Sequence, residues 1–185
     1  MLEVEVKYLA PNMVSIEERL RAWGAVAVEE RQDVDAYFNS PHRDFAQTDE
    51  ALRIRRIGKA NYVTYKGPRR DSTTKTREEI EVAFEAGDQP AEDFQQILLA
   101  LGFRPVAVVR KRRRIWRAVR DGYHLEICLD DVERVGHYLE VEIVAPDAEL
   151  EKARSVVLQA AADLGLTQPE RRSYLELLLA LRRTE

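Results

Sequence analysis

The sequence has one cysteine, three histidines and no long run of apolar residues. A single thiol, Cys128, excludes an internal disulfide and a zinc site built from several cysteines, and we expect it to be a buried packing residue. No stretch of about 18 apolar residues is available to span a bilayer, and residues 1–10 alternate acids with apolar residues instead of forming a signal pattern. These absences predict a cytoplasmic protein without a membrane partner.

Lysine is also scarce, since only six of the 29 basic residues are lysines and 23 are arginines. The formal net charge of −4 argues against nucleic acid as a partner, because non-specific nucleic-acid affinity comes mainly from neutralised phosphates. Arginine is the side chain suited to bidentate contact with a phosphate. The bias therefore indicates phosphate recognition more than a need for surface charge.

The apolar periodicity predicts a single domain over residues 1–185, made of four helices and eight strands. The predicted helices are Met13–Trp23, Pro90–Leu101, Ala148–Leu164 and Pro169–Leu181, with Asp147 as the cap of the third and a glycine after each of the first three. The predicted strands are Leu2–Leu9, Glu29–Phe38, Ala51–Ile57, Asn61–Tyr65, Thr76–Phe84, Val106–Val119, Tyr123–Leu129 and Tyr138–Val144. Because short loops join most strands, the sheet is predicted to be antiparallel.

Charged residues recur at every second position of nearly every predicted strand. Residues two apart on a strand point to the same face, so Glu3, Glu5 and Lys7 share one face of the first strand. The same spacing occurs in Arg53/Arg55, Tyr62/Thr64/Lys66, Arg77/Glu79/Glu81, Lys111/Arg113, Glu126/Cys128/Asp130 and Glu140/Glu142. On one or two strands this pattern is typical of a sheet with one face in water. On seven strands it would leave a broad mixed sheet of charge in solvent, which favours another arrangement.

Closing the sheet resolves the pattern, because about eight strands close around a space wide enough for one small ligand. We therefore predict an α+β fold, a closed eight-stranded antiparallel β-barrel surrounded by helices. A charged interior is costly unless its charges are matched. Carboxylate pairs supply the oxygen ligands that Mg²⁺ or Mn²⁺ prefers, and the basic residues suit a chain of phosphates. The predicted occupant is a divalent metal together with a polyphosphate.

These motifs, in this order, resemble the CYTH superfamily of triphosphate tunnel metalloenzymes. The resemblance covers residues 2–144 and rests on Glu-x-Glu-x-Lys at Glu3, Glu5 and Lys7 and on six later matches. The later matches are Arg53/Arg55, Lys66 in Tyr-Lys-Gly, Arg77/Glu79/Glu81, Lys111/Arg113, Asp130 before a glycine turn, and Glu140/Glu142. Within the superfamily the chain is most similar to the class IV adenylyl cyclase group, on Gln32-Asp-x-Asp-x-Tyr-Phe38, TDEALRIRR at residues 48–56, and Tyr65-Lys66-Gly67-Pro68.

The resemblance implies a role for each set of residues. Metal ligands would be Glu3, Glu5, Asp130, Glu140 and Glu142. Triphosphate-binding residues would be Lys7, Arg53, Arg55, Lys66, Arg77, Lys111 and Arg113, and all of these except Arg77 would be catalytic. Glu79, Glu81 and Glu126 would line the tunnel.

The implied activity is metal-dependent chemistry on a nucleoside or organic triphosphate, first of all conversion of ATP to cyclic AMP and pyrophosphate. A triphosphatase that releases orthophosphate is the alternative, and a non-catalytic polyphosphate-binding module is a third hypothesis. For Asp33, Asp35, Tyr37 and the loop at residues 68–75 we expect solvent-exposed positions, with a place at the tunnel mouth as the alternative. The sequence does not fix the oligomeric state, although a homodimer is the commonest assembly.

Overall fold

The computed structural model describes residues 2–69 and 77–182 of the chain. Its strands are β1 (Leu2–Leu9), β2 (Val26–Asn39), β3 (Ala51–Ile57), β4 (Ala60–Lys66), β5 (Glu79–Phe84), β6 (Arg104–Arg120), β7 (Tyr123–Val132) and β8 (Gly136–Ala145). Its helices are α1 (Met13–Ala22), α2 (Phe45–Thr48), α3 (Asp88–Ala100), α4 (Leu150–Asp163) and α5 (Tyr174–Arg182), and a 3₁₀ turn, η1 (Asp147–Glu149), precedes α4.

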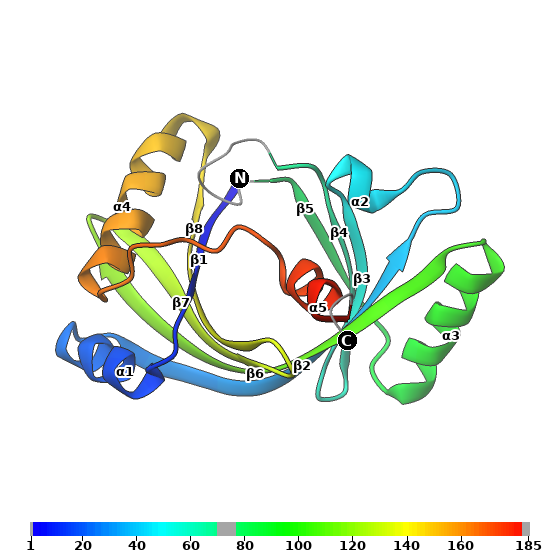
Figure 1. Cartoon of the computed structure of the whole chain (residues 1–185), viewed down its shortest axis with the longest axis horizontal. Helices are drawn as coiled ribbons and strands as arrows, with labels where there is room; N and C mark the ends of the chain where they lie inside the picture. Colours follow the sequence, from blue (N-terminus) through cyan, green and yellow to red (C-terminus); the bar gives the residue numbers. More distant parts are fainter. Residues whose placement is uncertain (1, 70–76, 183–185) are drawn as a thin grey trace.

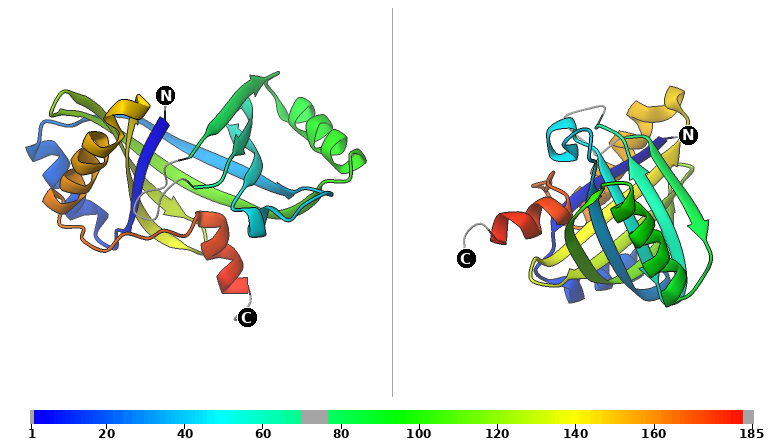
Figure 2. Two further views of the ribbon diagram at one scale, coloured as in Figure 1. Left: turned by 90° about the horizontal axis from the view of Figure 1, so that it is seen from above. Right: turned by 90° about the vertical axis from the view of Figure 1, so that its right-hand side faces the viewer.

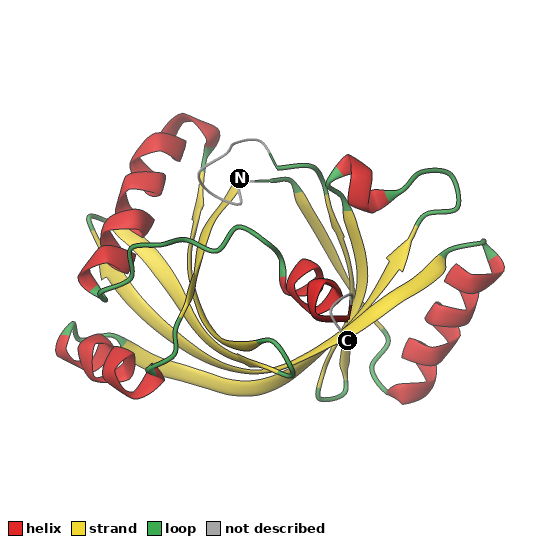
Figure 3. Cartoon of the chain, viewed as in Figure 1, coloured by secondary structure: helices red, strands yellow, loops and turns green. Residues whose placement is uncertain are grey.

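All eight strands form one antiparallel sheet in the order β1-β8-β7-β6-β2-β3-β4-β5. The sheet curls strongly, with the long strands β2 and β6 at its base and α5 between its two arms (Figures 1 and 3). Glu3 of the edge strand β1 also forms an isolated antiparallel bridge with Arg77, which lies two residues before the other edge strand, β5. The predicted α+β fold, an eight-stranded antiparallel sheet curled around an interior and accompanied by helices, is confirmed.

Helices cover the outer face of the sheet at both ends, as Figure 2 shows from two further directions. Helices α1 and α4 lie on one arm, where Leu20 and Val157 pack on the apolar face of β1, β7 and β8. Helix α3 lies on the other arm, where Leu98 packs against Phe38 and Ile54. A fully buried leucine or isoleucine contributes about 1.5–3 kcal/mol, so both arms are held from the outside and the charged faces of the strands are left for the interior.

Helix α5 lies on the inner side of the sheet. Its Leu177 and Leu178 pack against apolar residues of β2, β6 and β7, and Tyr174 packs beside Tyr138. The segment before α5 runs along β1, where Tyr8 pairs with Pro169 and the amide of Glu170 donates to the carbonyl of Lys7. The predicted helix start at Pro169 is therefore wrong. The helix begins after Ser173, whose hydroxyl accepts from the amide of Glu176 while the Glu176 carboxylate accepts from the amide of Ser173.

Other boundaries differ from the prediction by a few residues. The second strand starts at Val26 instead of Glu29, and β5 starts at Glu79, with the predicted start at Thr76 outside the described residues. Helix α2 was not predicted, because four residues are too short for a periodic signal. Asp147 begins the 3₁₀ turn instead of capping α4. The glycines predicted to follow three helices, Gly24, Gly102 and Gly165, all adopt the positive φ that this position requires.

Across residues 2–69 and 77–182 no helix combines the length and the apolarity needed to cross a bilayer.

Candidate active site

The concave face of the sheet encloses a cavity of about 430 Å³, a size within the usual range for small-molecule sites. The cavity is lined by nearly every side chain that the sequence placed in the interior. These are Glu3, Glu5, Arg53, Arg55, Lys66, Arg77, Glu79, Glu81, Lys111, Arg113, Glu126, Glu140 and Glu142. The two predicted site residues that do not line it are Lys7 and Asp130.

Strand register brings these side chains opposite one another. Glu5 pairs with Glu142 and Lys7 with Glu140 between β1 and β8, and Arg113 pairs with Asp130 between β6 and β7. Side chains of directly paired residues lie close together on one face. The period-two pattern of single strands thus becomes a two-dimensional array of charge.

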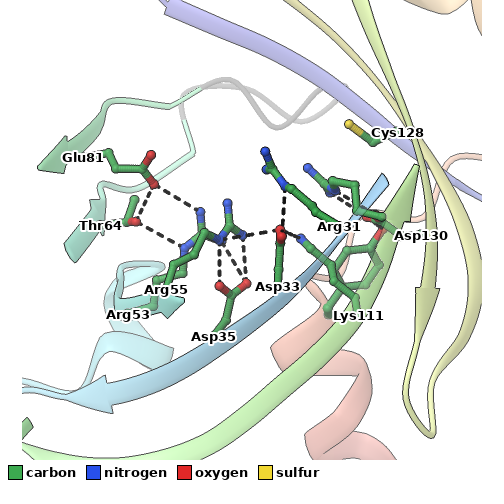
Figure 4. A network of polar contacts seen from close by, with 12 residues as sticks. Arg31, Asp33, Asp35, Arg53, Arg55, Thr64, Glu81, Lys111, Cys128 and Asp130 are labelled. Carbon is green, nitrogen blue, oxygen red and sulfur yellow. Dashed lines mark hydrogen bonds and ion pairs between the residues drawn. The ribbon is translucent and has the colours of Figure 1, made fainter. Parts of the chain in front are cut away.

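The first part of the array is built around Asp35, which is 2% exposed. Arg55 donates two hydrogen bonds to its carboxylate, from Nε at 2.7 Å and Nη2 at 2.8 Å, and Arg53 Nη1 lies 3.5 Å from Oδ2 (Figure 4). Burial alone would raise the pKa of Asp35, but Arg53 and Arg55 hold it well below its usual range. Asp35 is therefore charged in the folded protein and fixes both guanidinium groups.

Asp33 lies two residues before Asp35 on the same face of β2 and is also fully buried. Arg31 Nε donates to Oδ1 at 3.0 Å, and Oδ2 lies 3.7 Å from Lys111 Nζ (Figure 4). Burial, followed by the neighbouring Arg113, lowers the pKa of Lys111. The expectation of solvent exposure for Asp33 and Asp35 is thus wrong, because both carboxylates face the interior and pair with its cations.

Arg113 is held by carboxylates of the neighbouring strands β7 and β8. Its Nε and Nη2 donate to the two oxygens of Asp130 at 2.7 and 2.5 Å, and Nη2 also donates to Glu140 at 2.5 Å. Tyr174 of α5 donates its hydroxyl proton to Asp130 at 2.8 Å. Asp130 therefore lies behind Arg113, which explains why it does not line the cavity. We call Asp33, Asp35, Arg53, Arg55, Lys111, Arg113 and Asp130 the ion-paired wall.

The strands β4 and β5 add a smaller ion-paired group. Lys66 Nζ lies 2.5 Å from Glu79, and Thr64 donates to Glu81 at 2.7 Å. Burial opposes the ionisation of Glu79, but Lys66 and Arg53 outweigh it and lower the pKa to about 2. Glu79 is therefore an ionised carboxylate that faces both a lysine and an arginine.

The side of the cavity formed by β1 and β8 is rich in acids, and we call Glu3, Glu5 and Glu142 the carboxylate wall. Burial, and then the charge of Glu5, raises the pKa of Glu142 to about 7. Burial also raises the pKa of Glu3 well above its usual value, although Lys66 partly opposes this. Like charges that are partly desolvated resist ionisation together. A cation between these carboxylates would remove that resistance.

A divalent metal fits the donor chemistry of the carboxylate wall. Within residues 2–69 and 77–182 no three acidic, histidine or cysteine side chains are arranged as a ready-made metal cage. Mg²⁺ usually takes only one or two carboxylates and completes its coordination with water and substrate phosphates. Glu5 and Glu142 are paired across β1 and β8, and Glu3 lies two residues before Glu5 on the same face of β1. This arrangement suits that mode of binding.

Lys7 is placed differently from the other predicted phosphate ligands. It is 1% exposed, and its Nζ donates to the carbonyl of Arg172 at 2.5 Å. The same Nζ lies 4.0 Å from the centre of the Tyr174 ring, a favourable cation–π distance. The segment that leads into α5 therefore covers Lys7 and separates it from the cavity.

Sequence reasoning missed part of the site. Arg31, Tyr37 and Tyr174 line the cavity, and Asp33 and Asp35 support it from below. The signal for the β2 residues was present, because Arg31, Asp33, Asp35 and Tyr37 follow the same period of two. Tyr174 carried no such signal, since its place depends on the path of the C-terminal segment. Of the loop predicted at residues 68–75, residues 70–75 lie outside the described residues.

Comparison with known proteins gave consistent matches over nearly the whole chain. The CYTH domain family matches residues 1–174. A Methanocaldococcus jannaschii protein named "Putative adenylate cyclase" is 38% identical over 180 residues, which is 96% of this chain and 98% of that protein. The adenylate cyclase CyaB of Aeromonas hydrophila is 29% identical over 178 residues, covering 93% of this chain and 86% of that one.

Solved structures agree. A Pyrococcus horikoshii protein superposes with a TM-score of 0.85 at 38% identity and covers 97% of this chain and 99% of its own. A Hippeastrum protein, described as a "putative adenylyl cyclase" that reveals a dominant triphosphatase activity, has a TM-score of 0.65 at 16% identity and covers 99% of this chain and 95% of its own. At 16% identity, the similarity to the Hippeastrum protein is a similarity of fold alone.

Proposed function

This chain belongs to the CYTH domain family, and from that membership and its charged cavity we propose that it is a divalent-metal-dependent enzyme acting on an organic triphosphate. The observation that carries the proposal is the division of one cavity into an ion-paired wall and a carboxylate wall. A triphosphate chain needs several fixed cations, and the metal that accompanies it needs carboxylate oxygens. Neither wall alone would fit a metal–triphosphate complex.

The binding roles follow from the contacts. Arg53, Arg55 and Arg113 are oriented by buried carboxylates, so their remaining N–H groups would meet phosphate oxygens without reorganisation. Lys66, Arg77 and Lys111, which also line the cavity, would complete phosphate binding.

The metal would be Mg²⁺ or Mn²⁺, held by Glu3, Glu5 and Glu142 on the carboxylate wall. When bound it would neutralise charge on the phosphates. Asp130 and Glu140 both accept from Arg113, so in addition to any contact with metal they would position that arginine. Lys7 would support the phosphate site indirectly, because the segment before α5 lies between Lys7 and the cavity.

The proposed reaction is conversion of ATP to cyclic AMP and pyrophosphate, supported by two relatives named as adenylate cyclases. In this reaction the ribose 3′-oxygen displaces pyrophosphate at the α-phosphorus. The second candidate is hydrolysis at the γ-phosphorus with release of orthophosphate, which is favoured by the activity described for the Hippeastrum protein of the same fold. Both reactions require positioning and charge neutralisation, which this cavity would supply.

Product analysis tests the proposal. The protein is incubated with ATP, thiamine triphosphate and inorganic triphosphate, each with Mg²⁺ or Mn²⁺, and the products are identified. Cyclic AMP with pyrophosphate is the expected result, and orthophosphate would select the triphosphatase. Binding without turnover of any triphosphate would overturn both enzyme candidates and leave a binding module.

Two variants test the metal assignment. Glu5→Gln and Glu142→Gln should lower turnover at least about 100-fold, because loss of even an indirect metal partner costs ~10–100-fold. Circular dichroism should show both variants folded. Glu18→Gln, on the exposed side of α1, is the matched control. Full activity in both cavity variants would refute the assignment.

A further inference from the structure

Tyr174, the first residue of α5, connects the C-terminal helix to the charged part of the cavity. Its side chain lines the cavity, although the residue is almost fully buried. Its hydroxyl donates to Oδ2 of Asp130 at 2.8 Å, and the same oxygen accepts from Nη2 of Arg113 at 2.5 Å. One carboxylate oxygen therefore ties α5 to an arginine of the ion-paired wall.

The ring of Tyr174 also lies beside two buried lysines. Nζ of Lys7 is 4.0 Å from the centre of the ring, and Nζ of Lys111 is 5.4 Å from it. Both distances are within the range of about 6 Å for a cation–π contact, and such a contact is stronger where the cation has lost its water. Both lysines are almost fully buried. A single aromatic ring thus attracts two desolvated cations.

The position of the ring is fixed by contacts that do not involve the lysines. Ser173 and Glu176 define the start of α5 by their reciprocal hydrogen bonds. Leu178, in the next turn, belongs to the apolar cluster that α5 forms with β2, β6 and β7. The ring of Tyr138 meets that of Tyr174 edge-on, with the ring centres 5.5 Å apart. Helix α5 therefore holds the ring in place independently of the two cations.

We propose that Tyr174 is a positioning residue of the triphosphate site, whose ring attracts the ammonium groups of Lys7 and Lys111 and fixes their positions. This inference rests on the proposed function and extends it to α5, which follows all the phosphate-binding residues named above in the chain. Cations that are held in place before a ligand binds meet phosphate oxygens without reorganisation. Lys111 lines the cavity and would contact phosphate directly, whereas Lys7 would act through the segment that covers it. The alternative is that Tyr174 only fills space in the apolar cluster.

The test compares Tyr174→Phe with variants of the whole protein that carry a phenylalanine with one, two or three ring fluorines at the same position. These rings have nearly the same shape, but each fluorine weakens the negative potential of the face that attracts a cation. Calorimetry measures the binding of ATP and of inorganic triphosphate, each with Mg²⁺. Both affinities should fall stepwise along the series, by about tenfold in total. The two losses should be equal, because the ring acts on cations that bind phosphate.

Two controls separate the ring from the hydroxyl and from packing. Tyr174→Phe removes the hydrogen bond to Asp130, but Arg113 keeps both of its hydrogen bonds to that carboxylate. Tyr174→Phe should therefore weaken binding less than about fivefold. Leu178→Ala is the matched control for packing, because Leu178 is buried on the same helix but does not line the cavity. It should lower the free energy of unfolding in urea and change either affinity less than about threefold.

Each outcome has a distinct meaning. Equal stepwise losses for the two ligands, with little effect of Leu178→Ala, support the positioning role. Affinities that stay constant along the series would show that the ring only packs, and a gain would show that it competes with phosphate for the lysines. A loss confined to ATP would show that the ring acts on the organic group. Any of these three results overturns the inference and leaves the proposed function standing. If the unmodified protein binds neither ligand, the proposed function itself is contradicted, and the positioning role with it.

Discussion

The cavity has two walls that treat their charges in opposite ways. On the ion-paired wall each buried cation has an acidic partner, as Arg55 has Asp35 and Arg113 has Asp130. On the carboxylate wall the cross-strand neighbours are both acids, Glu5 and Glu142. The first wall is complete within the protein. The second carries an excess of negative charge that a bound metal would neutralise.

The difference has a consequence for how the site would work. Arginines fixed by buried acids keep one geometry whether or not a triphosphate is present, which is the condition for electrostatic preorganisation. The carboxylate wall resists full ionisation, as the pKa of about 7 at Glu142 indicates. Its charge state would therefore depend on pH and on metal. One wall would orient the ligand, and the other would respond to conditions.

The largest expected effect comes from breaking the ion-paired wall. Asp35→Asn keeps the shape of the side chain but leaves Arg53 and Arg55 buried without their shared carboxylate. Removing one partner of a buried ion pair costs about 3–5 kcal/mol. Urea denaturation should show a loss of that size in the free energy of unfolding.

The exposed Asp131, also on a strand, provides the control for this change, and Asp131→Asn should cost less than about 1 kcal/mol. A loss at Asp35 no larger than the loss at Asp131 would mean that cavity water solvates the arginines. The distinction between the two walls would then be lost.

The carboxylate wall should show the opposite dependence on pH. The pKa of Glu142 in the folded protein is about 7, above its ordinary value of 4.5. The stability linked to this group is therefore fully present below about pH 4.5 and is lost as the pH rises through 7. For Asp35 the folded pKa lies below the ordinary 3.8, so its contribution is present above that value and is lost as the pH falls.

Urea denaturation of metal-free protein between pH 5 and pH 8 measures the Glu142 effect. Relative to Glu142→Gln, the unmodified protein should lose about 1–2 kcal/mol over this range, since one pKa unit corresponds to 1.36 kcal/mol and the partly exposed side chain is screened. Mg²⁺ at pH 8 should reduce the difference. A difference that stays constant with pH would contradict the raised pKa of Glu142.

Both walls were largely predictable, and the reason is local. Alternation along a strand fixes which side chains share a face, so Glu3, Arg53 and Lys111 could be assigned to the interior from the sequence. Asp35 had the same spacing, but a solvent-exposed position was expected for it, with the tunnel mouth as the alternative. Its partners, Arg53 and Arg55, come from another strand, so its burial follows from strand pairing.

Features that depend on distant segments could not be predicted. Lys7 follows the same alternation as Glu5, yet the segment before α5 covers it, and 165 positions separate Lys7 from Arg172. The start of α5 was misplaced because Pro169 is a plausible first-turn residue. The actual signal was Ser173 with Glu176 three positions later. Such contacts are decided by the whole fold.

The smallest expected effect comes from the outer face of the same strand that carries Arg113. Arg112 pairs with Glu30 at 2.5 Å, but the two side chains are 60% and 49% exposed. Exposed pairs of this kind are worth ~0–1 kcal/mol and weaken with salt. Arg112→Met should therefore lower the free energy of unfolding by less than about 1 kcal/mol, and 1 M NaCl should remove most of that loss.

Arg113→Met, one residue along, would leave the carboxylates of Asp130 and Glu140 without their guanidinium partner, and about 3–5 kcal/mol should be lost with little dependence on salt. The two variants make the same Arg→Met substitution on the outer and the inner face of β6. If both variants lost the same free energy of unfolding, the exposure of an ion pair would not determine how much it contributes to stability. The difference expected between buried and exposed charges would then be contradicted.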